Sequence, residues 1–184
     1  MVRSLPVRPL QPIPRRPFHR SLHPPALIDA EELLRLSLEA TRTGRHDVAL
    51  DCLKRAREQA PERADIRHLL GAEYAQIGMH ERAEPEFAEA LRLEPDRHSA
   101  RFQFALVQMM RADVPTALQT LAPLLSLPPT DPMQRFGEGL DHLLRDRLEE
   151  AAASIESGLA LPVLNESLNT DMRMLLNSYT GKLQ

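Results

Sequence analysis

The chain of 184 residues has no tryptophan, a single cysteine and only 4% aromatic residues. With one cysteine, Cys52, an internal disulfide is excluded, which favours a reducing compartment. No apolar run is long enough to cross a bilayer, and no signal-peptide core follows the first basic residues. Arginine outnumbers lysine 21 to 2, as GC-rich coding tends to produce. We therefore expect a cytoplasmic bacterial protein without a transmembrane segment.

Motifs of catalysis are also missing. There is no glycine-rich phosphate loop, no paired-cysteine metal site and no nucleophile elbow. The seven histidines are scattered; His19 and His23 have helical metal-ligand spacing, but the surrounding prolines argue against a helix there. His46 and His80 are expected to face solvent at turns, and Cys52 to be a buried, inert thiol. We expect no catalytic residue, no metal and no cofactor.

What the sequence does contain is a repeat of 34 residues, marked by Ala49, Ala83, Ala117 and Ala151. Four positions after each alanine comes a bulky apolar residue, one helical turn further on. Prolines follow twelve positions after the first three alanines. Small residues let two helices approach closely, bulky ones fill the space between pairs, and proline ends the second helix. The period predicts stacked pairs of antiparallel helices.

At these positions the chain resembles the tetratricopeptide repeat (TPR) family. The second repeat matches best, with Leu70, Gly71, Tyr74, Gly78, Ala83, Phe87, Ala90 and Pro95. The third repeat has Asp113 and Pro115 in its turn, and the fourth has Glu138 where leucine is expected. The resemblance covers about 130 residues and implies an all-α, right-handed α-solenoid. Its four helix pairs are expected within 29–163, at about 30–63, 64–97, 98–131 and 132–163.

Two flanking segments differ from the repeats. Helical spacing of apolar residues in 164–184 predicts a helix that caps the last repeat, with dimerisation as the alternative. Residues 1–28 contain seven prolines, five arginines and no acidic residue, which predicts an extended basic arm. The arm could be a disordered tail, a docking segment for another protein or for the acidic repeats, or, with less support, an element that binds nucleic acid or lipid. Its candidate contact residues are Arg3, Arg8, Arg15, Arg16 and Arg20.

The resemblance also implies that the first helix of each pair lines a concave groove. The residues expected there become apolar in the third and fourth repeats, which favours binding of an amphipathic helix or extended peptide. Alternatively, some of them pack against the neighbouring pair, and the C-terminal helix fills part of the groove. The candidate groove residues are Leu34, Leu38, His68, Phe102, Leu106, Met109, Met110, Phe136, Leu140 and Leu143.

Together these features predict a non-enzymatic adaptor or assembly factor for a protein partner, as a subunit of a larger complex. Bacterial proteins similar to this one often serve secretion, pilus or envelope-polysaccharide systems. The alternative is an accessory subunit that regulates a larger enzyme through its basic arm. Nucleic acid is not the expected partner, because the arginines lack an aromatic ladder or folded basic face.

Overall fold

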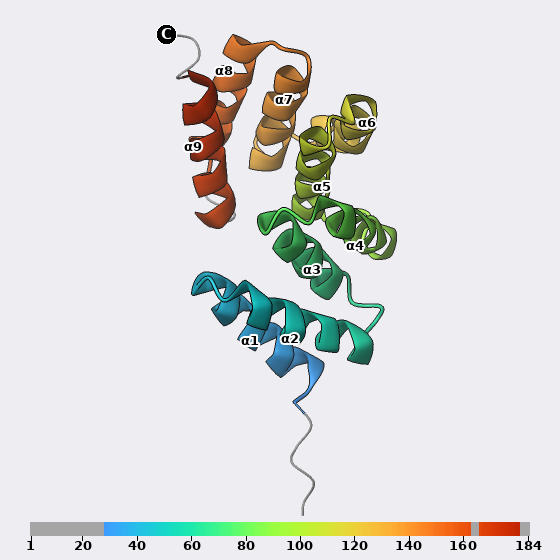
Figure 1. Ribbon diagram of the computed structural model, residues 1–184. Helices are drawn as coiled ribbons and strands as arrows, with labels where there is room; N and C mark the ends of the chain where they lie inside the picture. Colours follow the sequence, from blue (N-terminus) through green and yellow to red (C-terminus); the bar gives the residue numbers. More distant parts are fainter. Residues whose placement is uncertain (1–27, 163–165, 181–184) are drawn as a thin grey trace, which may run out of the picture.

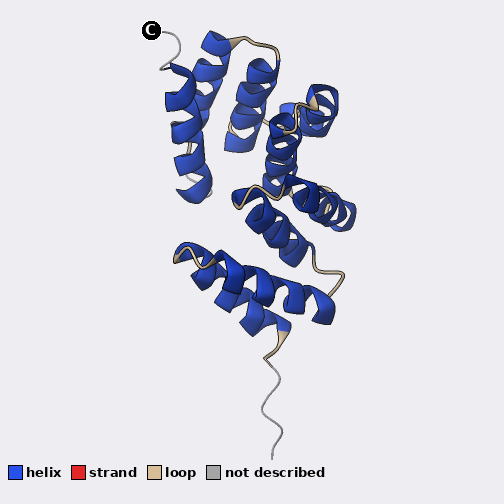
Figure 2. Ribbon diagram, viewed as in Figure 1, coloured by secondary structure: helices blue, strands red, loops and turns tan. Residues whose placement is uncertain are grey.

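The computed structural model describes residues 28–162 and 166–180, and all regular structure in these ranges is helical (Figures 1 and 2). The helices are α1 (Ala30–Arg42), α2 (His46–Gln59), α3 (Ala64–Gln76), α4 (His80–Leu93), α5 (His98–Met110), α6 (Val114–Leu125), α7 (Pro132–Leu144), α8 (Leu148–Leu159) and α9 (Glu166–Thr180). Successive helices pack in antiparallel pairs, and the pairs stack into an α-solenoid (Figure 1). The fold class expected from the sequence is therefore confirmed. The predicted arm, with its five arginines, lies outside the described residues except for Ile28.

The four turns that close the helix pairs share one backbone conformation. Each has a residue with positive φ at the same register: Gly44 (70°), Gly78 (76°), Ala112 (61°) and Asp146 (58°). In each turn the next residue's N–H donates to a carbonyl five positions earlier, as from Arg45 to Ala40 at 2.8 Å. This bond satisfies a carbonyl at the end of the first helix. The turn is thus preserved in the third and fourth repeats, where glycine is absent.

Close approach of the two helices in a pair depends on small side chains. The four repeat alanines are at most 1% exposed, which agrees with their role in the sequence pattern. At Gly139 a Cβ would lie 2.6 Å from Cγ1 of Ile155, and at Gly158 it would lie 2.6 Å from Cε1 of Phe136. Side chains at these glycines would push the helices apart.

The core divides into two clusters along the solenoid. The first is built mainly by α1 to α4 and includes Leu33, Leu53, Leu70 and Phe87. The second is built by α5 to α9, and the rings of Phe102 and Phe136 lie at its centre with their centroids 6.4 Å apart. Leu168 and Met172 of α9 are buried in this second cluster, and α9 packs beside α8 (Figure 1). The C-terminal helix therefore covers apolar surface of the last two repeats.

Candidate partner-binding groove

A hollow of about 640 Å³ lies on one side of the solenoid, formed by α1, α3, α5 and the start of α9. We call it the groove. Its wall contains both apolar and polar side chains, among them Leu38, Thr41, Arg42, His68, Leu69, Ala72, Gln76, Gln103, Leu106, Met110, Leu168 and Asp171. Leu38 and Met110 are the most exposed apolar side chains of this set, at 50% and 67%. They give the groove an apolar surface that no described residue covers.

Some of the residues expected from the sequence do line this groove. Leu38, His68, Leu106 and Met110 are all part of its wall. Met109 and Leu143 are half-buried and pack against the second core cluster. Leu34, at 8% exposure, belongs to the first cluster.

Three expected groove residues need correction. Phe102, Phe136 and Leu140 are at most 1% exposed and form the centre of the second core cluster. Leu168 and Met172 of α9 join that cluster, so the apolar side of the third and fourth repeats is occupied by the chain itself. For these three residues the alternative interpretation holds: they pack in the core, and the C-terminal helix fills the space beside them. In this conformation they offer no surface to a partner.

His68 is the central polar group of the groove. Its Nε2 lies 2.8 Å from Oε1 of Gln103, which connects α3 to α5. Burial lowers the pKa of His68, although the bond to Gln103 opposes this shift. The imidazole is therefore neutral at pH 7, and it contributes hydrogen bonding rather than positive charge.

Asp171 is the acidic group at the α9 end of the groove. Desolvation raises the pKa of its carboxyl, and no basic side chain of the described chain pairs with it. Arg42, by contrast, is neutralised by Glu39 at 2.7 Å. A basic group of a ligand would therefore find an unpaired carboxylate at this end of the groove.

Two buried glutamates that sequence reasoning missed hold the first two repeats together. Glu73 is 2% exposed; it accepts a hydrogen bond from Oγ1 of Thr41 at 2.8 Å and lies 2.6 Å from Nδ1 of His46. His46 was expected to face solvent, and this is corrected by its contact with Glu73. Glu86, at 7% exposure, pairs with Arg57 and with Arg67.

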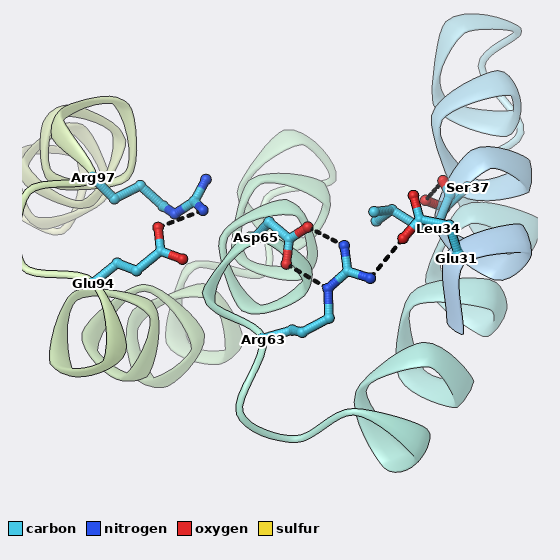
Figure 3. Close-up of polar contacts among 7 residues, drawn as sticks. All are labelled: Glu31, Leu34, Ser37, Arg63, Asp65, Glu94 and Arg97. Atoms are coloured by element: carbon cyan, nitrogen blue, oxygen red, sulfur yellow. Dashed lines mark hydrogen bonds and ion pairs between the residues drawn. The ribbon is translucent and has the colours of Figure 1, made fainter. Parts of the chain in front are cut away.

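The starts of the first helices carry a second set of ion pairs (Figure 3). Arg63 lies between Asp65 and Glu31, and its Nη1 donates a hydrogen bond to Oε2 of Glu31 at 2.7 Å. Arg97 donates to Glu94 at 2.6 Å. Because Arg63 and Arg97 occupy helix N-cap positions, where positive charge is unfavourable, these carboxylates compensate for the helix dipoles.

Beside Arg97 lies a second hollow of about 700 Å³, which we call the edge hollow. Asp96, Asp131 and Met133 contribute to its wall. Ser99 and Leu168 line both the edge hollow and the groove, so the two spaces adjoin.

Other site types receive little support from the described part of the chain. Within it, no group of three or more His, Cys, Asp or Glu residues is placed to hold a metal ion. Cys52 is 6% exposed, and burial raises the pKa of its thiol. None of the described helices has the length and apolar character to span a membrane.

Neither a protein-family model nor a curated protein matches the sequence. Solved structures do match the fold. MamA (41-end) from Desulfovibrio magneticus RS-1 is 19% identical, with 83% of this chain and 92% of that chain covered and a TM-score of 0.59. A chain of the APC/C hetero-tetramer Cut9–Hcn1 is 16% identical, with 89% of this chain and 32% of that chain covered and a TM-score of 0.72. These likenesses define the chain as a TPR-like α-solenoid.

Proposed function

We propose that the protein is a non-enzymatic adaptor or assembly factor that binds a segment of a protein partner in the groove. The observation that carries this proposal is the exposure of Leu38, on α1, and Met110, on α5, in the lining of one hollow. Exposed apolar side chains gathered in a concavity are typical of interaction sites. The Cut9–Hcn1 structure, a complex of a similar solenoid with another chain, agrees with this role.

The partner segment is an amphipathic helix or an extended peptide with apolar side chains for Leu38 and Met110. A basic residue of the segment would pair with Asp171, which also lines the groove. Methionine at position 110 adapts its flexible side chain to the shape of the bound residue. We further propose, by analogy with similar bacterial proteins, a cytoplasmic role as a fixed subunit of a secretion, pilus or envelope-polysaccharide system.

The test uses a groove variant, Leu38→Glu with Met110→Glu, and a matched control, Val48→Glu. Val48 is also exposed and apolar, at 38%, but it does not line the groove. Partners captured from native lysate are compared quantitatively, and a peptide from the enriched partner is then titrated against each purified chain. We expect the groove variant to lose the peptide and Val48→Glu to retain it. Equal binding by both variants would reject the groove as the binding site.

The charge distribution supports a second candidate function, regulation of a larger enzyme through the arm. Residues 1–28 carry five arginines and no acid, whereas the remaining chain carries 18 basic and 26 acidic residues. Replacing the five arginines by glutamine distinguishes the two functions. Loss of the partner in this variant, with retention in the groove variant, would favour the regulatory function.

A further inference from the structure

The groove and the edge hollow adjoin, and we call the two hollows together the path. Ser99 and Leu168 line both spaces, which have volumes of about 640 and 700 Å³. Its lining extends from residues at the start of α5, through Leu168 of α9, to Leu38 on α1. Two adjoining hollows suit an extended chain better than a compact ligand.

The path carries unpaired negative charge in each of its two parts. Among the described residues, no basic side chain pairs with the carboxylate of Asp96 in the edge hollow or with that of Asp171 in the groove. The arginines on the path are already occupied, because Arg42 pairs with Glu39 and Arg97 with Glu94. An occupant with arginines spaced along an extended backbone would complement both carboxylates.

Such an occupant exists in the same chain. Residues 1–27 contain five arginines and no acidic residue, and apolar side chains such as Leu5 and Leu10 stand between them. The segment joins the repeats at Ile28, whose carbonyl accepts a hydrogen bond from Gln59 at 3.0 Å. A proline-rich chain spans about 3.1 Å per residue, so 27 residues reach about 80 Å. Helices pack about 8–10 Å apart, which places α5 within about 40 Å of α1.

We propose that residues 1–27 dock in cis along this path, with guanidinium groups at Asp96 and Asp171 and apolar side chains at Leu38 and Met110. Tethering supports docking within one chain, because a linked segment is present at an effective concentration on the order of millimolar. A partner segment must then displace the arm before it binds. The inference rests on the proposed function only in this last consequence.

The test measures arm docking directly in the full chain, without any partner. A spin label is attached at Ser4→Cys in a chain whose Cys52 is replaced by Ala, and methionine methyl groups are observed by NMR. Docking predicts loss of signal intensity at Met110, in the groove, and at Met133, in the edge hollow, relative to a diamagnetic label. A second sample, in which spin-labelled chains are mixed with isotope-labelled chains, should show no such loss.

Charge variants complete the test. Asp96→Lys with Asp171→Lys should restore the Met110 and Met133 signals, whereas Glu156→Lys, which changes an exposed acid of α8, should not. If the lysine pair disturbs the fold, Asp96→Asn with Asp171→Asn removes both charges and should have the same effect. The proposal would be overturned if the spin label caused no loss of signal at Met110 and Met133 in the parent chain. It would also be overturned if the same loss persisted in both the lysine and the asparagine double variants of Asp96 and Asp171. Losses that appear in the mixed sample would show docking between copies, which overturns docking in cis.

This design separates the two proposals. Failure of the groove variant to lose a partner peptide would count against the proposed function alone. Absence of the spin-label effect, with peptide binding intact, would count against arm docking alone.

Discussion

The two halves of the solenoid have the same fold but are joined by different chemistry. Between the first and second repeats, Glu73 and Glu86 are buried and bonded to side chains of the neighbouring repeat. Between the third and fourth repeats, among the described residues, no ion pair crosses the junction, and pairs such as Arg145 with Asp141 stay within the fourth repeat. There the third and fourth repeats meet through Phe102 and Phe136, and α9 covers the contact.

This difference shows that helix spacing and junction chemistry are separate properties of a repeat. Small residues in every repeat fix how closely the helices of a pair approach. The residues between repeats are free to be charged or apolar, provided that buried charges are paired. The groove stays open beside α1 and α3 of the first half, whereas Phe102 and Phe136 of the second half are covered by their own core and by α9.

The largest expected effect tests the apolar junction. Phe136→Ala removes a ring that is 1% exposed and should lower the free energy of unfolding by about 3–5 kcal/mol. Urea denaturation at several salt concentrations measures this loss, which should not depend on salt. A loss below about 1 kcal/mol would mean that the cavity collapses and that the ring is not central to the junction.

The next effect tests the charged junction. Glu86→Gln removes the carboxylate between Arg57 and Arg67 and should cost about 2 kcal/mol, because two partly buried guanidinium groups lose their partner. Glu89→Gln, on the same helix but in a surface pair with Arg92, is the matched control and should change stability very little. Equal effects of the two variants would show that burial of Glu86 has no energetic role.

A gain of stability should distinguish the turns of the two halves. Ala112 has a φ of 61°, which is strained for a residue with a Cβ, so Ala112→Gly should stabilise the protein by about 1 kcal/mol. Gly78→Ala, at the same register in the second repeat, should destabilise it by a similar amount. Thermal denaturation of the two variants should thus show melting temperatures that move in opposite directions.

The smallest effect concerns pH and the contact between the halves. Because burial lowers the pKa of His68, the unfolded chain binds the proton more tightly than the folded one. The contribution of His68 to the free energy of unfolding is therefore fully present above the ordinary histidine pKa of about 6.5, and it is lost as the pH falls below that value. His68→Asn should keep a polar partner for Gln103 and flatten this part of the stability profile. An unchanged profile would assign the pH dependence to other groups.

The repeat period predicted the fold well because it reports local packing. It predicted stacked helices with small residues between them, and the four repeat alanines are buried between helices. It did not show that Phe102 and Phe136 are core residues, because an apolar helix face looks the same whether another helix or solvent meets it. The chain supplies that missing helix itself, as α9.

The buried glutamates were missed for a related reason. Acidic residues on a helix are usually solvated, so Glu73 and Glu86 gave no signal of their own. Register could have revealed them. Glu86 stands 34 residues after Cys52, and Glu73 stands 34 before Val107, both of which are buried apolar residues. An acidic residue at a repeat position that is buried and apolar in another repeat predicts a buried ion pair or a hydrogen-bonded carboxylate.

The contact between Phe136 and Gly158 has a consequence for how this sequence can change over time. Since even a Cβ at 158 would lie 2.6 Å from the phenyl ring, any replacement of Gly158 requires the ring of Phe136 to shift. Which residues are accepted at position 158 therefore depends on the residue at position 136, and the reverse also holds. We expect homologues to vary the two sites as a pair, with a smaller residue at the first accompanying any larger residue at the second.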